Sequence, residues 1–324
     1  MRQILLIGYS YIAQKRILPV LSRHPHATLV GIASQTKFNK IPKDFPAYKS
    51  YKEALEKTNC DTVYISLHNS AHFQWITYFL KLGKHVICDK PAVLTKKEAE
   101  ICYKIASGKL VIFEAFPYLY HEQHTLLMDH LKKQNSPVQN ITAHFGFPPL
   151  NRQNFRNYAS LGGGCIYDIC PYLLSVGRFY FETRSLKLYC SIHKDKKYGV
   201  PISASVTIHF GENKTLQGFV GFELEYRNHL ELWGQTFHFS LDRAFSTPPD
   251  FENIIYYKSK DREDNLLRVP ACDAFSKMFT HYNTIVNDRS YRIYNQMFLD
   301  QATALDTMSQ SAKAGKPKNI FYKQ

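Results

Sequence analysis

The chain opens with Arg2-Gln3-Ile4-Leu5-Leu6-Ile7-Gly8-Tyr9-Ser10-Tyr11-Ile12-Ala13, the stretch that decides the fold class. Residues 2–7 form a short apolar run typical of a buried strand, and residues 11–22 carry apolar side chains at helical spacing. Gly8 and Ala13 match the pattern G-x-G-x-x-G/A, with Ser10 at the middle glycine. Such a turn lets backbone N–H groups and a helix N-terminus meet a pyrophosphate. A plain strand-to-helix turn without a ligand is the alternative.

Strand-like and helix-like segments alternate through the first third of the chain. Strand-like runs follow over residues 28–33, 62–66, 85–88 and 110–114. Helical spacing falls between them, over residues 52–57, a segment ending near Leu80, and residues 96–106. This alternation builds βαβ units and therefore a doubly wound parallel sheet. We predict an α/β fold class, with an N-terminal Rossmann dinucleotide-binding domain over residues 1–118.

The pattern changes after a predicted helix over residues 118–133. Strand-like runs separated by turn residues cover residues 185–192, 203–210, 215–222, 227–233 and 236–241, and helical stretches cover residues 275–287 and 296–311. We predict a C-terminal α+β domain over residues 119–324, with a mainly antiparallel open sheet, for substrate binding and dimerisation.

The composition is that of a folded protein. The chain has 324 residues, of which 44% are hydrophobic, and this excludes disordered and fibrous classes. Its apolar runs fall well short of the ~20 residues that a membrane-spanning helix needs. The N-terminus has neither a long apolar region nor a small-residue cleavage site, which argues against a signal peptide. We therefore expect a cytoplasmic protein that does not act at a membrane.

The charge balance is strongly basic, with a formal net charge of +14. The basic residues are dispersed, and their densest clusters, at residues 194–197 and 313–323, are not interleaved with stacking aromatic side chains. This distribution argues against nucleic-acid binding and suits phosphate-bearing small molecules. Seven scattered cysteines without a C-x-x-C pair predict neither a disulfide framework nor a metal site.

The second strand ends without the acidic residue that would hold the ribose 2′-hydroxyl of NAD. The chain instead has Ser34 and Gln35, followed by Lys37 and Lys40. A hydroxyl, an amide and basic groups suit a 2′-phosphate, so this segment favours NADP(H) over NAD(H). A solvated basic loop is the alternative.

Asp89-Lys90-Pro91 follows the fourth strand, at the kind of strand end where ligands of open α/β sheets gather. A lysine there can bridge cofactor and substrate and can polarise a group or move a proton. The proline fixes the backbone beside it. Lys90 as an ordinary surface charge is the alternative.

The least generic segment is residues 154–172, NFRNYASLGGGCIYDICPY. Three glycines open an apparent helix on which Asp168 and Tyr172 lie four residues apart, on one face. Pro171 should loosen or kink that helix near Tyr172. A tyrosine hydroxyl can protonate a nascent alkoxide if a cation such as Lys90 lowers its pKa. A core helix in which Tyr172 only packs is the alternative.

Together, these motifs resemble those of the glucose–fructose oxidoreductase / inositol dehydrogenase (Gfo/Idh/MocA) family over nearly the whole chain. That family typically has a glycine-rich first turn, then Pro-Asn-x-x-His, Glu-Lys-Pro, Glu-Ala-Phe-Met-Tyr and Gly-Gly-Gly-x-x-x-Asp-x-Gly-x-His/Tyr. The corresponding segments here are Gly8–Ala13, His68–His72, Asp89–Pro91, Glu114–Tyr118 and Gly162–Tyr172.

Within the family, the chain is most similar to the NDP-hexose 3-ketoreductases of deoxysugar biosynthesis. The similarity lies in residues 12–19, 118–124, 147–149 and 245–249, and in Arg156 before the glycines. It implies hydride transfer from NADPH to a keto group, expected at C3, of a nucleotide-linked sugar. Tyr172 would donate the proton, Lys90 would orient and acidify it, and Asp168 would position Tyr172 or a sugar hydroxyl.

The resemblance and the strand-end chemistry together define the predicted site. The expected catalytic residues are Lys90, Tyr172 and Asp168, and the expected substrate-binding residues are Tyr118, Arg156 and Tyr172. The residues expected to bind NADP(H) are Gly8, Ser10, Tyr11, Ile12, Ser34, Gln35, Lys37, Leu67, His68, Asn69, His72, Asp89 and Lys90.

Several positions depart from the family pattern. Ser10 replaces the middle glycine, although its hydroxyl still suits a pyrophosphate, and His68 stands where proline is usual. Asp89 is shorter than the usual glutamate. Cys170 replaces the glycine between Asp168 and Tyr172, and with the proline that follows it is expected to reshape the catalytic helix.

Two other functions stay open. One is an NAD-dependent sugar or polyol dehydrogenase of the same family, a group that more often has histidine at the position of Tyr172. The other is a non-catalytic dinucleotide- or sugar-binding sensor, favoured by Ser10, His68 and Cys170. In each case the expected ligand is a sugar or nucleotide sugar. We also expect a homo-oligomer, a dimer or tetramer, formed through the C-terminal sheet.

Overall fold

The computed structural model describes residues 1–134, 136–183, 186–259 and 264–320. It divides into two compact units, described separately below. Unit 1 comprises Met1–Phe116 and Phe275–Ala302, and unit 2 comprises Pro117–Ala274 and the chain from Thr303 onward. Unit 1 ends two residues before the predicted boundary at residue 118, and it also includes the later segment Phe275–Ala302.

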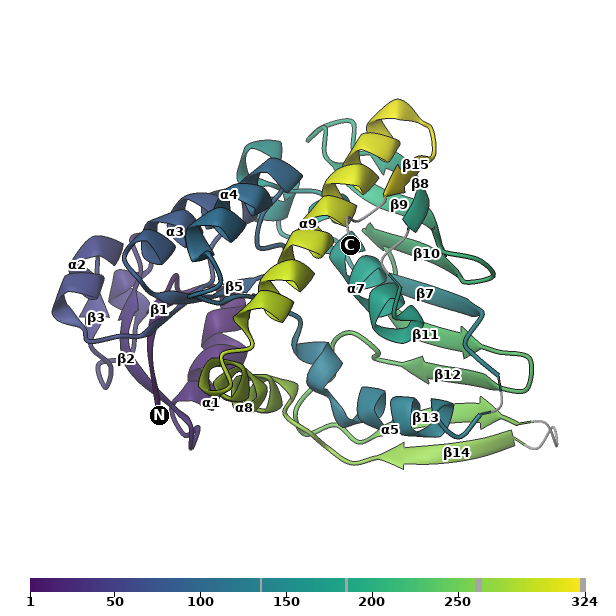
Figure 1. Ribbon diagram of the computed structural model, residues 1–324. Helices are drawn as coiled ribbons and strands as arrows, with labels where there is room; N and C mark the ends of the chain where they lie inside the picture. Colours follow the sequence, from purple (N-terminus) through teal and green to yellow (C-terminus); the bar gives the residue numbers. More distant parts are fainter. Residues whose placement is uncertain (135, 184–185, 260–263, 321–324) are drawn as a thin grey trace. The chain divides into compact units, whose positions relative to one another are not determined.

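Unit 1 contains a parallel sheet whose described strands lie in the order β3-β2-β1-β4-β5-β6 (Figure 1). The strands are β1 (Arg2–Ile7), β2 (Ala27–Ala33), β3 (Ala47–Tyr48), β4 (Thr62–Ile65), β5 (His85–Asp89) and β6 (Ile112–Ala115). This is the doubly wound order of a Rossmann sheet, which confirms the predicted fold class. The β3 strand was not predicted, because two residues give no readable period.

The helices of unit 1 are α1 (Leu18–Leu21), α2 (Tyr51–Lys57), α3 (Asn69–Lys81), α4 (Lys96–Ala106), α8 (Ala274–Asn287) and the first part of α9 (Tyr291–Ala314). The helix predicted over residues 11–22 is helical but contains a π-helical segment, Ala13–Ile17, before α1. Pro19 explains the wider turn, because it has no N–H to donate to a carbonyl of the preceding turn.

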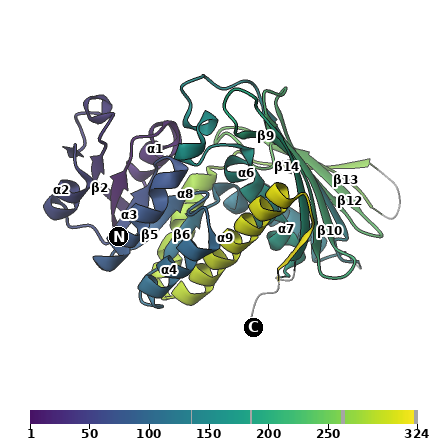
Figure 2. The same ribbon diagram turned by 90° about the horizontal axis from the view of Figure 1, so that it is seen from above.

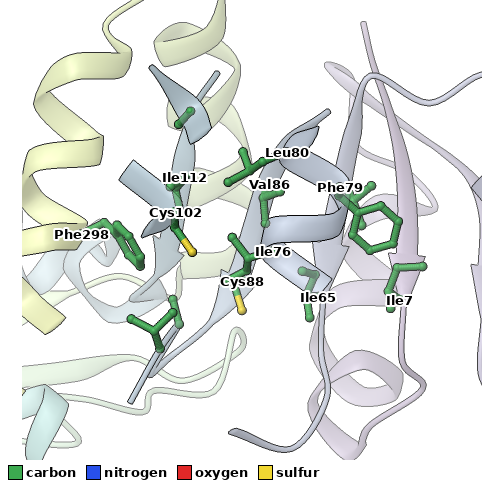
Figure 3. Packing of buried hydrophobic residues seen from close by; sticks show 14 of the residues in the cluster. Ile7, Ile65, Ile76, Phe79, Leu80, Val86, Cys88, Cys102, Ile112 and Phe298 are labelled. Atoms are coloured by element: carbon green, nitrogen blue, oxygen red, sulfur yellow. The ribbon is translucent and has the colours of Figure 1, made fainter. Parts of the chain in front are cut away.

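The core of unit 1 joins segments far apart in the sequence. Ile76 and Phe79 of α3 pack with β-strand residues such as Val86, all three of them fully buried. Phe298 of α9 belongs to the same cluster, and Figure 3 shows it near Cys102. Helix α9 therefore contributes to the same core as residues that lie almost two hundred positions earlier in the sequence.

Unit 2 contains a sheet whose described strands lie in the order β14-β13-β12-β11-β7-β10-β9-β8-β15. The strands are β7 (Asn140–Phe147), β8 (Leu186–Lys194), β9 (Pro201–Phe210), β10 (Thr215–Phe222), β11 (Arg227–Trp233), β12 (His238–Asp242), β13 (Asn253–Lys258), β14 (Asp264–Val269) and β15 (Lys318–Ile320). Strands β7 and β10 are parallel and the other neighbours are antiparallel. The mainly antiparallel sheet is confirmed, although β7, β13, β14 and β15 were not predicted. Ser185, in one predicted strand, lies outside the described residues.

The helices of unit 2 are α5 (Glu122–Leu131), α6 (Cys165–Asp168), α7 (Cys170–Phe181) and the last part of α9. A 3-10 turn, Pro117–Tyr120, precedes α5, so the helix predicted over residues 118–133 is broken at His121, whose side chain caps α5. Helix α7 lies against one face of the sheet (Figure 2). Its Gly177 lets it approach closely, because a Cβ atom there would lie 2.3 Å from the Phe210 ring. No helix among the described residues is long and apolar enough to cross a membrane.

Candidate active site

The turn after β1 accepts only glycine at its first position. Gly8 has a φ of +94°, and a Cβ atom there would lie 2.1 Å from the backbone oxygen of Ser66. The Ala13 N–H donates to Oγ of Ser10 over 3.0 Å, so the serine caps the start of the helix. The first N–H groups of a helix lack partners within it, so those of Tyr11 and Ile12 are suited to an anion. The exposed Tyr11 side chain leaves this helix start accessible.

A chain of hydroxyl groups connects this turn to the end of β5. Oγ of Ser10 lies 2.7 Å from Oγ of Ser66, the residue directly after β4. Ser66 donates to Oδ2 of Asp89 over 2.6 Å, and the Tyr64 hydroxyl donates to Oδ1 over 2.7 Å. Burial raises the pKa of the Asp89 carboxyl, while these two hydrogen bonds lower it. Ser66 and Tyr64 were not predicted as site residues, although a serine directly after an apolar strand, at a carboxyl edge, is a readable signal.

His72 holds the backbone beside Lys90. Its Nδ1 lies 2.9 Å from the carbonyl oxygen of Pro91, and its Nε2 lies 3.1 Å from that of Leu67. Burial lowers the pKa of His72. Because the side chain is fully buried, the structure gives His72 a supporting role beneath the loops after β4 and β5. The Lys90–Pro91 peptide bond is cis.

The remaining predicted cofactor residues also lie at strand ends. Ser34 follows β2 and is buried, and its Oγ accepts a hydrogen bond of 3.1 Å from the N–H of Lys37. Gln35 is exposed and Lys37 is half-buried. His68 precedes α3, and Asn69 is its first residue and is buried. The predicted cofactor residues of unit 1 therefore follow the carboxyl ends of β1, β2, β4 and β5, the edge where dinucleotides bind in this fold.

In unit 2, the glycines at residues 162–164 let the chain fold closely around Arg156. A Cβ atom on Gly163 would lie 2.4 Å from the Arg156 carbonyl oxygen, and the N–H of Gly164 donates to that oxygen over 2.8 Å. Nε of Arg156 in turn donates to Oδ2 of the buried Asp168 over 2.7 Å. Two predicted site residues are thus paired with each other.

The prediction that Asp168 and Tyr172 share one continuous helix is wrong. Helix α6 ends at Asp168, Ile169 follows with a φ of −113°, and α7 begins at Cys170. Pro171 lies in the first turn of α7, where its missing N–H costs nothing. The same missing donor prevents a continuous helix. The loosening or kink that was expected near Tyr172 is instead an interruption at Ile169, between α6 and α7.

Aromatic rings surround Tyr172. Its ring centroid lies 5.6 Å from that of Tyr118, 5.3 Å from Phe145 and 5.5 Å from Phe245. The Tyr118 hydroxyl lies 2.7 Å from Oγ of Ser175, which donates to the Tyr172 carbonyl oxygen over 3.1 Å. Tyr118 is 4% exposed, and burial raises its pKa. The structure therefore places Tyr118 as a support for Tyr172. Phe145 and Phe245 were not predicted, because the residues around Tyr172 come from separate parts of unit 2.

Lys90 belongs to unit 1, and Tyr172 and Asp168 belong to unit 2. Their joint action therefore stays a prediction, and so does contact between NADP(H) and the strand-end residues. Among the described residues, no group of three or more His, Cys, Asp or Glu side chains is placed to hold a metal ion.

Two family matches cover most of the chain. Residues 2–115 match the oxidoreductase family with an NAD-binding Rossmann fold, and residues 137–239 match the Gfo/Idh/MocA C-terminal domain.

Individual relatives are similar over nearly their whole length. The dTDP-3,4-didehydro-2,6-dideoxy-alpha-D-glucose 3-reductase of Saccharopolyspora spinosa is 28% identical over 96% of this chain and 97% of its own. The enzyme of the same name from Actinomadura kijaniata is 25% identical over 95% of both chains. Among solved structures, KijD10, a 3-ketoreductase from Actinomadura kijaniata in complex with NADP and TDP-benzene, superimposes with a TM-score of 0.89 at 25% identity, over 96% of this chain and 97% of that one.

Proposed function

The chain belongs to the Gfo/Idh/MocA family of oxidoreductases, and from this premise we propose that it is an NADP(H)-dependent reductase of a nucleotide-linked keto-sugar. The reduced keto group is at C3. The observation that carries the proposal is the full-length similarity to dTDP-sugar 3-reductases, together with the likeness to a 3-ketoreductase solved with NADP. The basic net charge of +14 suits a cofactor and a substrate that each carry a diphosphate.

The turn after β1 suits a dinucleotide. Gly8 lets the backbone turn closely past Ser66, because a Cβ atom there would lie 2.1 Å from the Ser66 backbone oxygen. This tight turn would present the start of the following helix to a pyrophosphate. Ser34, Gln35 and Lys37 follow β2 without a carboxylate, and they would receive a ribose 2′-phosphate. When bound, NADPH supplies the hydride.

Tyr172 and Lys90 carry out the proton chemistry. As the ketone carbon gains the hydride, its oxygen becomes an alkoxide and takes the proton of the Tyr172 hydroxyl. Lys90 stabilises the tyrosinate that remains, which regains a proton from solvent. Asp168, paired with Arg156, fixes the segment that leads into α7. The ring contacts of Phe145 and Phe245 restrict the Tyr172 side chain to a narrow range of positions.

The test compares Lys90→Ala and Tyr172→Phe with Tyr167→Phe, a tyrosine of α6 outside the proposed chemistry. Turnover of dTDP-linked 3-keto sugars is expected to fall at least about a hundredfold in the first two variants, the scale of general acid–base catalysis. Their NADPH Kd should stay within about threefold of wild type. Unchanged turnover in both would overturn the assignment, and NADPH binding without turnover in the wild type would favour a sensor.

A homo-oligomer, dimer or tetramer, formed through the sheet of unit 2 is part of this proposal. Large side chains on one face of the sheet are exposed, namely Tyr189, Phe219, Trp233, Tyr256 and Leu266. A second copy of the chain packed on this face would bury these side chains. Light scattering of the wild type and of Trp233→Glu tests it, because a monomeric wild type would contradict the proposal.

A further inference from the structure

We propose that Ser66 is a positioning residue for the cofactor turn, because its hydroxyl joins Ser10 of that turn to Asp89, the neighbour of Lys90. The inference rests on the proposed function, which assigns the turn to NADP(H). It goes beyond it by linking two departures from the family pattern, Ser10 for glycine and Asp89 for glutamate. Through Ser66 these two residues form one hydrogen-bonded unit.

The direction of each hydrogen bond follows from the atoms involved. An ionised carboxylate only accepts, so the Ser66 hydroxyl donates its proton to Asp89 over 2.6 Å. The Ser66 oxygen is then left to accept, and the contact of 2.7 Å with Ser10 must have Ser10 as donor. The Ser10 oxygen accepts the N–H of Ala13 over 3.0 Å. Each hydroxyl therefore has one orientation, set by the charge of Asp89.

Ser66 holds the turn at two points. Its backbone oxygen occupies the space that a side chain on Gly8 would need, and its hydroxyl receives the Ser10 side chain. Ser66 is 1% exposed, so solvent cannot replace its hydroxyl. Loss of that hydroxyl would leave Asp89 without one donor and Ser10 without its acceptor. The helix start that faces the pyrophosphate would then lose its connection to β5.

The test measures NADPH affinity by fluorescence titration in Ser66→Ala, Ser10→Ala and the double variant. We expect Kd to rise about five- to fiftyfold in Ser66→Ala, because a buried charged acceptor loses a partner. The double variant should bind NADPH no more weakly than the weaker of the two single variants, since all three variants interrupt the same series of hydrogen bonds. Ser66→Thr, which keeps the hydroxyl, should bind within about threefold of wild type. Ser22→Ala is the matched control, since Ser22 donates to a helix carbonyl elsewhere in unit 1.

The pH dependence of NADPH affinity distinguishes positioning from a loss of packing. Removing a donor from Asp89 makes its ionised form less favourable. The acid limb of the affinity profile should therefore move to higher pH in Ser66→Ala and stay in place in Ser22→Ala. The other titratable groups beside the carboxyl are Tyr64, Cys88, His72 and Lys90, and all are unchanged in both variants.

The outcomes separate the two proposals. Wild-type binding of NADPH with an unchanged Kd in Ser66→Ala, or additive effects in the double variant, overturns the role of Ser66 and leaves the proposed function standing. Wild-type protein that fails to bind NADPH overturns both. If Ser66→Ala does not fold, Ser10→Gly carries the test, because it removes the same hydrogen bond from the half-buried side and restores the usual glycine.

Discussion

Nε of Arg156 donates a hydrogen bond of 2.7 Å to Oδ2 of Asp168, a carboxylate whose side chain is 7% exposed. The sequence predicts that Arg156 binds substrate and that Asp168 positions Tyr172 or a sugar hydroxyl. In the structure, Arg156 supplies a counter-charge to a buried carboxylate. It also joins the loop before the three glycines to the end of α6, from which the chain turns into α7.

We expect Arg156→Met to lower the free energy of unfolding by about 1–2 kcal/mol, because it removes a cation that pairs with a buried carboxylate. The figure is below that for a fully buried pair, since the arginine side chain is 30% exposed. Asp168→Asn should cost less, and a double-mutant cycle in urea should give a clear coupling energy. Arg152→Met, at an exposed arginine nearby, is the control. Equal effects of Arg156→Met and Arg152→Met would mean that the ion pair contributes nothing.

Gly8 and Gly83 both have a positive φ, but only at Gly8 would a side chain also clash with neighbouring atoms. Replacing each with alanine therefore distinguishes the cost of backbone strain from the cost of a steric clash. Gly8→Ala combines an unfavourable φ with a Cβ atom 2.1 Å from the Ser66 oxygen, whereas Gly83, with a φ of +73°, has no atom within 4 Å of the place that a Cβ atom would take. We expect Gly83→Ala to destabilise unit 1 by about 1 kcal/mol. Gly8→Ala should cost more than about 2 kcal/mol and abolish NADPH binding. Thermal unfolding with and without NADPH measures both, and similar losses at the two positions would contradict the steric explanation.

The sequence predicted the first unit well because its helices and strands follow local periods. Strand β4 is fully buried over Thr62–Ile65 and reads as a continuous apolar run. Strand β7 (Asn140–Phe147) was missed, although it alternates buried and less buried residues. Its parallel neighbour β10 lies some seventy residues later, and nothing local to either segment specifies that pairing.

In the candidate site too, residues within local motifs could be predicted and the contacts between them could not. Gly8, Asp89 and Asp168 stand in motifs, so their importance could be predicted from spacing. The links between them are tertiary contacts. The Ser10–Ser66–Asp89 connection joins the ends of three different strands, and no pattern in the sequence states which hydroxyl faces which.

The buried His124 should make unit 2 sensitive to acid. Its Nε2 lies 3.0 Å from the Ala244 carbonyl oxygen and its Nδ1 lies 2.7 Å from the Tyr180 hydroxyl. A carbonyl only accepts, so Nε2 carries the proton of a neutral ring and Nδ1 accepts from Tyr180. Burial lowers the pKa of His124 to about 4.

The sign of the effect follows from this lowered pKa. The unfolded chain, with a histidine pKa near ~6.5, binds a proton before the folded protein does. Stability is therefore full above about pH 6.5 and falls as the pH drops toward 4, by about 2 kcal/mol at pH 5 from this residue. In His124→Gln the fall in unfolding free energy between pH 7 and 5 should be smaller by that amount. His193→Gln, at an exposed histidine of β8, should leave the slope unchanged, and equal slopes in all three proteins would refute the assignment.

Lys37 provides the sharpest test of cofactor choice. It lies in the turn after β2, where its N–H is fixed by Oγ of Ser34, and its ammonium group is proposed to meet the 2′-phosphate that distinguishes NADPH from NADH. Lys37→Glu should raise the NADPH Kd at least about tenfold, because a charge-assisted contact becomes a repulsion. The NADH Kd should stay within about threefold. Lys43→Glu, at an exposed lysine further along the same loop, makes the same change in net charge. It therefore corrects for the long-range field of a strongly basic protein, which salt screens. A parallel loss of NADPH and NADH affinity in Lys37→Glu would place the 2′-phosphate elsewhere.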